Sequence, residues 1–234
     1  MAKSLIIGGS GDIGLSIVDE CLARGDEVIL HYNNADIEIL KSRYKHQPVS
    51  FLKLDLTEKI TFRELDEINH IDHLIYVAGQ SLFGAIQDIS DEDIDGQYLI
   101  NVYNLIKVVQ ALVDRLRQSD NGRIIVISSI WGETGASYET IYSTMKAAQL
   151  GFIKSLAKEL ALTSITVNAI TPGVVHGKMT NELDEMTQIQ LKEDIPQNRF
   201  ITTKEISSCV AYLLDPLSQS VTGQVLRING GWYT

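Results

Sequence analysis

Short apolar runs alternate along the chain with longer amphipathic segments. The runs that predict strands span residues 5–7, 27–31, 49–54, 71–77, 123–128, 165–170 and 224–228. Four segments have a helical pattern. The first ends at about residue 24, the second spans 91–117, the third continues from Tyr142 to about residue 162, and the fourth spans 204–214. Strands that alternate with helices form a parallel sheet covered on both faces. We therefore predict an α/β fold with a doubly wound parallel sheet, and residues 1–234 as a single domain.

A glycine-rich loop, Gly8-Gly-Ser-Gly-Asp-Ile-Gly14, joins the first predicted strand to the first predicted helix. Glycines let a backbone approach a pyrophosphate, and a helix N-terminus offers free N–H groups and a positive dipole end. A plain turn between strand and helix is the alternative, but the strand–loop–helix context fits a dinucleotide site. The pattern therefore predicts a Rossmann-type fold. Its candidate cofactor-binding residues are Gly8, Ser10, Gly11, Asp12, Ile13 and Gly14.

The second predicted strand ends in His31-Tyr-Asn-Asn34, and the first acidic residue after it is Asp36. A cofactor without a 2′-phosphate usually meets an Asp or Glu at this strand end. Nothing at residues 31–34 would repel a 2′-phosphate, although no arginine is present there to bind one. We therefore predict NADP(H) in preference to NAD(H), with Asn33 near the 2′ position.

Tyr142 and Lys146 are four residues apart, so on a helix they lie one turn apart on the same face. A tyrosine has an unperturbed pKa of about 10, and a nearby ammonium favours the phenolate and lowers that pKa. A phenol tuned in this way can donate a proton to a carbonyl oxygen while a hydride reaches the carbon. The pair therefore predicts a carbonyl reductase.

A second pair, Tyr103 and Lys107, has the same spacing, and each tyrosine has a serine 13 residues upstream. Ser90 precedes three acidic residues and predicts the N-cap of the helix that carries Tyr103. These two side chains would lie about 20 Å apart along that helix. Ser129 instead follows the apolar run 124–127, and a strand end and a later helix can meet at one site. We therefore select the pair of Tyr142 and Lys146.

Charge and composition exclude several classes of function. The formal net charge of −10 argues against a nucleic-acid-binding surface, which would be basic. No apolar run approaches the ~20 residues of a membrane span, and the N-terminus does not have the pattern of a secretory signal. The two cysteines, Cys21 and Cys209, lie in predicted helices without metal-ligating neighbours. We expect a cytoplasmic protein with no metal site. The polar segment 176–198 is predicted to cover the substrate as a lid.

With these residues assembled, the chain resembles the short-chain dehydrogenase/reductase family over nearly its whole length. The motifs that carry the resemblance are the glycine loop, Asp55, Ala78-Gly79, Asn101, Ser129, Tyr142-x-x-x-Lys146 and Asn168-Ala-x-x-Pro-Gly173. Within the family, the C-terminal part is similar to 3-oxoacyl-[acyl-carrier-protein] reductases. The motifs shared with that group are Ile195-Pro-Gln-Asn-Arg-Phe200, Glu205-Ile206, Val221-Thr-Gly-Gln and Asn229-Gly-Gly231.

The resemblance implies a catalytic tetrad. Tyr142 would be the general acid, and Lys146 would lower its pKa and hold the nicotinamide ribose. Ser129 would hydrogen-bond the carbonyl oxygen. Asn101, which on its own would be assigned to a solvated helix surface, would open its helix locally and hold a water in a proton relay to Lys146. Further cofactor contacts implied by the resemblance are Asp55, Leu56, Ala78, Gly79, Pro172, Gly173 and Val175.

Three positions depart from the family pattern. Asp12 replaces a glycine of the loop, and its carboxylate would either weaken cofactor binding or cap the helix. Tyr76 begins the segment Tyr76-Val-Ala-Gly79, where the family has Asn-Asn-Ala-Gly, so we expect a structural hydrogen-bonding side chain to be lost. Gly177 stands where a threonine often holds the nicotinamide carboxamide. These departures concern cofactor affinity more than chemistry.

The resemblance implies an NADPH-dependent ketoreductase of the 3-oxoacyl-[acyl-carrier-protein] reductase type, with a role in fatty acid biosynthesis. One alternative is a reductase of a ketone on a modified protein side chain, similar to the elongation factor P 5-aminopentanone reductase. Another is a non-catalytic NADP-sensing binding protein, against which the complete tetrad argues. The expected partners are a small-molecule or carrier-bound keto substrate and further copies of the chain in a homotetramer or homodimer, with no nucleic acid and no membrane.

Docking of acyl-carrier protein is expected to be weak. The carrier is acidic, and the reductases that this chain resembles offer arginines just before the strands that correspond to 123–128 and 165–170. The matching segments here, 119–121 and 162–164, contain no cation. Arg123 and Arg199 remain as local contacts, although Arg123 opens a predicted strand and is equally consistent with a structural role. The net charge of −10 would also repel an acidic partner.

Overall fold

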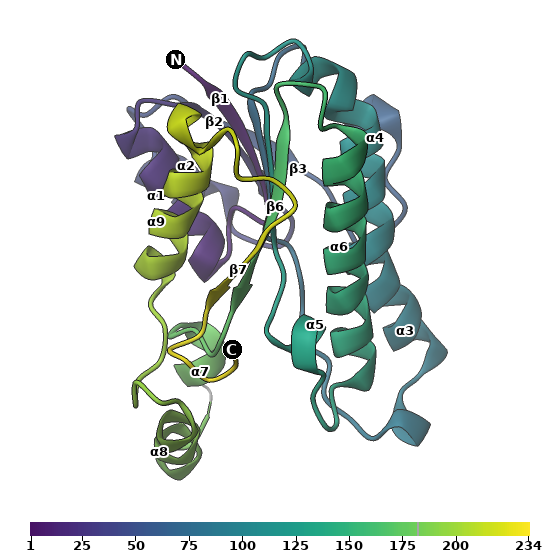
Figure 1. Ribbon diagram of the computed structural model, residues 1–234, viewed down its shortest axis with the longest axis vertical. Helices are drawn as coiled ribbons and strands as arrows, with labels where there is room; N and C mark the ends of the chain where they lie inside the picture. The colour runs from purple at the N-terminus through teal and green to yellow at the C-terminus, as the bar shows by residue number, and fades with distance from the viewer. Residues whose placement is uncertain (182) are drawn as a thin grey trace.

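The computed structural model describes residues 1–181 and 183–234 and contains one sheet of seven parallel strands (Figure 1). The strand order is β3-β2-β1-β4-β5-β6-β7. The strands are β1 (Lys3–Ile7), β2 (Glu27–Tyr32), β3 (Val49–Lys53), β4 (His73–Tyr76), β5 (Arg123–Ile127), β6 (Thr166–Pro172) and β7 (Val225–Ile228). The prediction of a doubly wound parallel sheet of the Rossmann type is confirmed.

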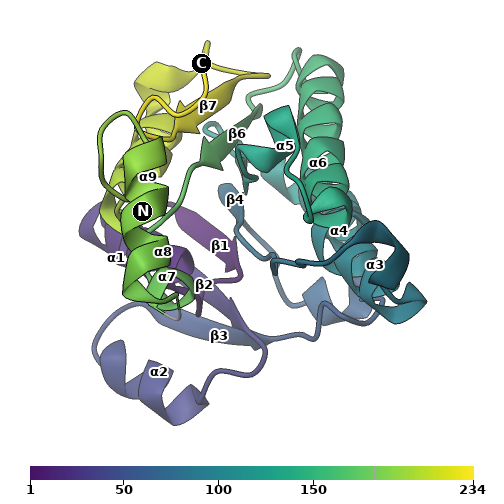
Figure 2. The same cartoon turned by 90° about the horizontal axis from the view of Figure 1, so that it is seen from below.

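Helices cover both faces of the sheet, with α1, α2 and α9 on one face and α3, α4 and α6 on the other (Figures 1 and 2). The α-helices are α1 (Asp12–Ala23), α2 (Ile37–Arg43), α3 (Asp91–Tyr98), α4 (Asn104–Leu116), α5 (Trp131–Thr134), α6 (Thr140–Glu159), α7 (Lys178–Asn181), α8 (Glu185–Asp194) and α9 (Thr203–Leu214). Short 3-10 turns occur at Phe62–Leu65, Ile86–Asp88 and Pro216–Ser218, and a π-helical turn occupies Leu99–Tyr103.

Apolar side chains on both faces of the central strands explain this layering. Every residue of β4, β5 and β6 is buried, as expected of parallel strands that are covered on both sides. Helix α4 presents Leu105, Val108, Leu112 and Leu116 to the sheet at helical spacing, and all four are buried. Burial of each such side chain is worth about 1.5–3 kcal/mol. The apolar helix faces and the buried strands together fix the positions of the loops at the strand ends.

Because all seven strands are parallel, their carboxyl ends lie at one edge of the sheet, the lower edge in Figure 1. The glycine loop follows β1, Ala78-Gly79 follows β4, Ser129 lies two residues after β5, and Gly173 follows β6. Helices α5, α7 and α8 lie at or beyond this same edge. Ligands of open α/β sheets bind outside the carboxyl ends of the strands. The topology therefore gathers the predicted site residues at one edge.

Several element predictions need correction. The helix predicted over 91–117 is divided, because the π-helical turn separates α3 from α4. Helix α2 was not predicted; it begins where the Asp36 carboxylate accepts a hydrogen bond from the Glu38 backbone N–H. The predicted lid, 176–198, contains α7 and α8 within the described residues. Within those residues, no helix has both the length and the apolar character that a membrane crossing requires.

Arg123 has a structural role. Its side chain is 1% exposed at the start of β5. The guanidinium donates to the backbone carbonyls of Gly122 at 2.8 Å, Leu213 at 3.0 Å and Asp215 at 3.3 Å. Burial lowers the pKa of Arg123, and the nearby charge of Asp215 opposes that shift. The cation thus satisfies carbonyls at the end of α9, and it is not exposed to a partner.

Candidate active site

Three elements supply the predicted tetrad. Ser129 follows β5, Tyr142 and Lys146 lie one turn apart on α6, and Asn101 lies in the π-helical turn before α4. Asn101, Ser129 and Lys146 are buried, with side chains 0%, 8% and 3% exposed. Ser129 acts on the pKa of the Tyr142 phenol as a side-chain hydrogen-bond partner, and Lys146 Nζ lies 5.7 Å from the centroid of the Tyr142 ring. The structure therefore brings Ser129, Tyr142 and Lys146 together.

Hydrogen bonds hold both the side chain and the backbone of Lys146. Its Nζ donates to the Ile127 carbonyl at 3.1 Å, and its own carbonyl accepts from Ser128 Oγ at 3.0 Å. A β-carbon added at Gly79 would lie 3.0 Å from Lys146 Nζ and 3.2 Å from Asn101 Oδ1. The glycine after β4 therefore allows the ammonium and the Asn101 amide to approach the same point. Burial lowers the pKa of Lys146 to about 7.

The pKa of Tyr142 differs from the expectation. Burial raises it to about 12, the hydrogen bond with Ser129 opposes the rise, and the charge of Glu139 adds to it. Lys146 is not among the causes of this shift, and burial lowers its own pKa to about 7. The phenol therefore stays protonated near neutral pH. A protonated phenol can donate to a carbonyl oxygen, which is the role required in ketone reduction.

The π-helical turn opens the helix at Asn101, as the resemblance implied. Its wider turn leaves carbonyls that need other donors. Tyr76 Oη donates to the Ile100 carbonyl at 2.5 Å, and Gln149 Nε2 donates to the Asn101 carbonyl at 2.9 Å. Tyr76 nevertheless supplies a hydrogen bond of its own, because its hydroxyl reaches from β4 to the π-helical turn. Tyr76 and Gln149 are supporting residues that the sequence alone did not reveal.

The Asn101 side chain is held on one side only. Its Nδ2 donates to the backbone and side-chain oxygens of Gln97, each at 3.0 Å. Its Oδ1 is buried and has no hydrogen-bond partner within residues 1–181 and 183–234. A buried acceptor without a partner costs about 1–3 kcal/mol. This orphaned oxygen, beside Gly79 and Lys146, fits the polar relay that the resemblance implies.

The second tyrosine–lysine pair is engaged elsewhere. Lys59 Nζ lies 5.4 Å from the centroid of the Tyr103 ring, and Lys107 Nζ lies 4.1 Å from that of Phe62. Ser90 caps α3 by accepting a backbone N–H of its first turn. The predicted N-cap is thus present. Tyr103 and Lys107 each contact a different aromatic or cationic partner, which supports the choice of Tyr142 and Lys146.

The glycine loop has the form of a cofactor cradle. Gly8 has a φ of +84°, and a β-carbon there would lie 2.6 Å from the Ala78 backbone nitrogen. Gly11, the residue before α1, is open by contrast: a β-carbon there would have one neighbour within 4 Å, the Gly8 carbonyl at 3.7 Å. An open glycine at a helix N-terminus fits the close approach of a pyrophosphate. The residues present therefore fit a dinucleotide.

His31 supports this cradle, a role that the sequence did not indicate. Its Nδ1 accepts the Gly8 backbone N–H at 2.8 Å, and its Nε2 lies 3.2 Å from the Leu54 carbonyl. Burial lowers the pKa of His31 to about 4, so the ring is neutral at pH 7. A neutral ring with its proton on Nε2 satisfies both contacts. His31 thereby ties the loop after β1 to the ends of β2 and β3.

The remaining predicted cofactor residues lie after their strands. Asp55 accepts hydrogen bonds from the Thr57 backbone and hydroxyl at 2.9 and 2.7 Å, and these bonds lower its pKa. Leu56 is buried. Val175, two residues beyond Gly173, pairs with Ile201 in an isolated bridge. Candidate residues from β1, β3, β4 and β6 thus reach the same edge of the sheet.

Aromatic residues from the C-terminal tail flank the candidate site. Trp131 opens α5, and its backbone N–H donates to Ser129 Oγ at 3.2 Å. Its ring packs edge to face on Trp232 and Tyr233, with centroids 5.3 and 5.8 Å apart. The C-terminal tail therefore packs on Trp131 of its own chain, next to Ser129.

Comparisons with known proteins identify the family to which the chain belongs. A family model described as enoyl-(acyl carrier protein) reductase matches residues 9–233. The chain is 36% identical to the uncharacterized oxidoreductase YmfI of Bacillus subtilis over 98% of each chain. It is 31% identical to the 3-oxoacyl-[acyl-carrier-protein] reductase FabG of Aquifex aeolicus, over 98% of this chain and 96% of that one.

Solved structures with the same fold cover nearly the whole chain. A short-chain dehydrogenase/reductase from Serratia marcescens superposes with a TM-score of 0.90 at 28% identity, over 100% of this chain and 98% of that one. An actinorhodin polyketide ketoreductase variant with NADPH superposes with a TM-score of 0.89 at 26% identity, over 99% and 97% of the two chains. The chain therefore belongs to the short-chain dehydrogenase/reductase family and is an oxidoreductase. A non-catalytic binding protein is correspondingly disfavoured.

Replacement of Tyr142 by Phe removes the proposed proton donor and one oxygen atom. We expect kcat to fall at least ~100-fold, as it does on loss of a positioned general acid, while cofactor affinity changes little. Steady-state kinetics and fluorescence titration of NADPH measure the two quantities. Tyr103→Phe is the matched control and should keep full activity. An active Tyr142→Phe variant would contradict the choice between the two pairs.

Lys146 should make stability depend on pH. Its folded pKa of about 7 lies below the unfolded value, so protonation favours the unfolded state between about pH 7 and 10. Lys146→Met removes this penalty and should stabilise the fold more at pH 7 than at pH 9.5, with a difference of about 3 kcal/mol. Urea unfolding at the two pH values measures it. Lys154→Met, at an exposed position of α6, should give the same change at both pH values.

Proposed function

We propose that this chain is an NADPH-dependent ketoreductase of the 3-oxoacyl-thioester type. The observation that carries the proposal is the meeting of Ser129, Tyr142 and Lys146 beside the glycine loop, with the phenol protonated at neutral pH. Tyr142 donates its hydroxyl proton to the ketone oxygen as that oxygen gains negative charge. Ser129 donates a hydrogen bond to the same oxygen and stabilises that charge. Lys146 then returns a proton to the phenolate, and solvent replaces that proton through a water that Asn101 Oδ1 would hold.

The chain's own residues account for cofactor binding. Gly11 and the first turn of α1 would hold the pyrophosphate, and Lys146 would hold the nicotinamide ribose. When bound, the nicotinamide supplies a hydride to the carbonyl carbon. The Asp36 carboxylate accepts a hydrogen bond from the Glu38 nitrogen at 2.8 Å and so caps the first turn of α2. It is therefore not the carboxylate at the end of β2 that a cofactor without a 2′-phosphate usually meets. That arrangement supports NADPH over NADH.

The substrate class rests on the related ketoreductases, and carrier docking is proposed to be weak. Arg123 is buried among backbone carbonyls, and Arg199 is paired with Glu205 at 2.7 Å. Neither arginine is therefore available as a free cation for an acidic carrier protein. With a net charge of −10, long-range repulsion acts in the same direction.

The engagement of both arginines favours a second candidate function. This is reduction of a ketone on a modified protein side chain, as in the elongation factor P 5-aminopentanone reductase type. Such a substrate needs the same tetrad and no docking patch for an acidic carrier.

For assembly, we propose a cytoplasmic homotetramer built through α4 and α6, with the tail Trp232–Tyr233 next to Trp131 of its own chain.

The cofactor assignment predicts a higher kcat/KM with NADPH than with NADH. Asn33→Asp should shift the preference toward NADH, because a carboxylate at the end of β2 repels a 2′-phosphate and binds a ribose hydroxyl. Initial rates with both cofactors over a concentration series measure the ratio. Asn34→Asp, one residue further from the strand, is the control. Equal kcat/KM for both cofactors in the unmodified protein would refute the preference.

The substrate assignment predicts that a small 3-oxoacyl thioester is reduced. Tethering that thioester to acyl-carrier protein should raise kcat/KM by less than about tenfold, or 1.4 kcal/mol. Rates with the two substrates at low and physiological salt measure the gain. A hundredfold gain that falls with salt would restore a dedicated role in fatty acid synthesis. No reduction of the thioester, with reduction of a keto-modified protein, would favour the second candidate.

A further inference from the structure

Asp12 and Gly177, two of the three departures from the family pattern, contact each other. Asp12 is the first residue of α1, and Gly177 directly precedes α7. Asp12 Oδ2 accepts a hydrogen bond from the Lys178 backbone N–H at 2.6 Å, across 166 residues of sequence. A carboxylate that accepts a backbone N–H forms a charge-assisted bond, about twice as strong as a neutral one. The two departures therefore form a single structural feature.

Gly177 makes this contact possible because it has no side chain. A β-carbon at position 177 would lie 2.5 Å from Asp12 Oδ2 and 3.3 Å from its Cγ. The Asp12 carboxylate thus occupies the space that a threonine would fill. Behind it, the buried Thr180 hydroxyl bonds both the nitrogen and the carbonyl of Gly177, each at 3.0 Å. The start of α7 is thereby shaped to receive the carboxylate.

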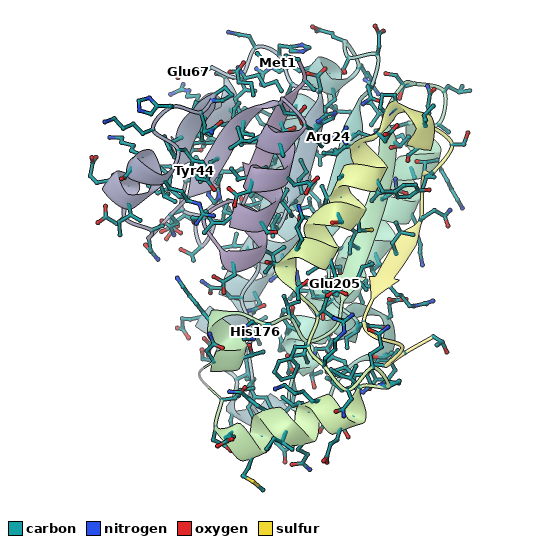
Figure 3. The ribbon with its side chains drawn as sticks, turned by 90° about the vertical axis from the view of Figure 1, so that its left-hand side faces the viewer. Met1, Arg24, Tyr44, Glu67, His176 and Glu205 are labelled. Atoms are coloured by element: carbon teal, nitrogen blue, oxygen red, sulfur yellow. The ribbon has the colours of Figure 1, made fainter. Side chains whose placement is uncertain are left out.

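The contact joins two segments that border the proposed cofactor site. Asp12 follows Gly11 of the glycine cradle, and residues 177–181 follow the Gly173–Val175 segment after β6. Figure 3 shows His176 beside α7. It lies just beyond the N-terminal end of α1, and Arg24 marks the other end of that helix. A cavity of about 430 Å³, lined in part by Asp12, His176 and Lys178, lies along this junction. The hydrogen bond between Lys178 and Asp12 is exposed to solvent and borders this cavity, so it lies outside the buried core.

We propose that Asp12 and Gly177 form a latch that holds residues 176–181 against the glycine loop and slows release of the bound nicotinamide cofactor. The inference rests on the proposed function in requiring that this cofactor binds. Asp12 acts as a positioning residue: its carboxylate is directed to α7 rather than to the pyrophosphate. The latch offsets, through retention of the cofactor, the threonine contact that the family pattern has at position 177.

Asp12→Ala removes the acceptor and should speed dissociation of NADPH about tenfold, measured by stopped-flow fluorescence. Ala is a good residue for the first turn of a helix, so α1 should be retained. Slower dissociation would mean that the carboxylate repels the pyrophosphate, and an unchanged rate would mean that the contact does not retain cofactor. Either result would overturn the latch.

Gly177→Ala tests the other half, because its β-carbon must displace the carboxylate. It should speed dissociation to a similar extent, and the double variant Asp12→Ala/Gly177→Ala should be no faster than either single variant. An additive, hundredfold increase would show that the two positions act separately. Asp184→Ala is the control, since that carboxylate caps α8 locally through the Thr187 nitrogen; its dissociation rate should match that of the unmodified protein.

Hydrogen–deuterium exchange of the cofactor-free protein gives a second readout, independent of catalysis. In Asp12→Ala, the amides of residues 177–181 should exchange at least several-fold faster, while those of α9 stay unchanged. Unaltered exchange at 177–181 would overturn the latch even if the chain is a ketoreductase. Faster exchange with no ketoreductase activity would leave the latch standing and reject the proposed function, so the two failures are distinguishable.

Discussion

A lysine side chain buried beside a tyrosine is the constraint on which the rest of the site depends. An ammonium in this position loses its hydration, and the backbone carbonyl of Ile127 replaces only part of it. The pKa of Lys146 therefore falls to about 7, while the pKa of the neighbouring, half-buried Tyr142 rises to about 12. Both shifts follow from placing α6 against the end of β5. The chemistry is thus a consequence of helix packing before any ligand is considered.

The helix opposite Lys146 is shaped to the same end. A regular helix from α3 into α4 would bond its own carbonyls, whereas the π-helical turn at Leu99–Tyr103 frees them for side chains from β4 and α6. Tyr76 and Gln149 supply those donors. They keep a less common backbone conformation in place and hold Asn101 at a fixed depth in the core. Strand, helix and turn are therefore mutually dependent at this point.

The architecture was largely predictable because it follows from local periodicity: seven apolar runs corresponded to seven strands. The glycine loop and the pair of Tyr142 and Lys146 were also evident from spacing. Asn101 became a candidate only through the family resemblance, since a mid-helix asparagine has no distinctive local pattern. The supporting contacts of His31 and Tyr76 were not predictable, because each joins elements whose relative positions only the folded sheet defines. The raised pKa of Tyr142 likewise depends on burial, which sequence spacing does not express.

The contact between Asp12 and Gly177 restricts how these two positions can change during descent. A side chain at 177 and the present position of the Asp12 carboxylate exclude each other, since the two would approach within 2.5 Å. A lineage that starts from glycine at 12 and threonine at 177 must therefore lose the threonine before an aspartate at 12 can make this contact. Glycine at both positions is the permissive intermediate. Among homologues, the two residues should be inherited as a pair, and an aspartate at 12 should mark chains that have already given up the side chain at 177.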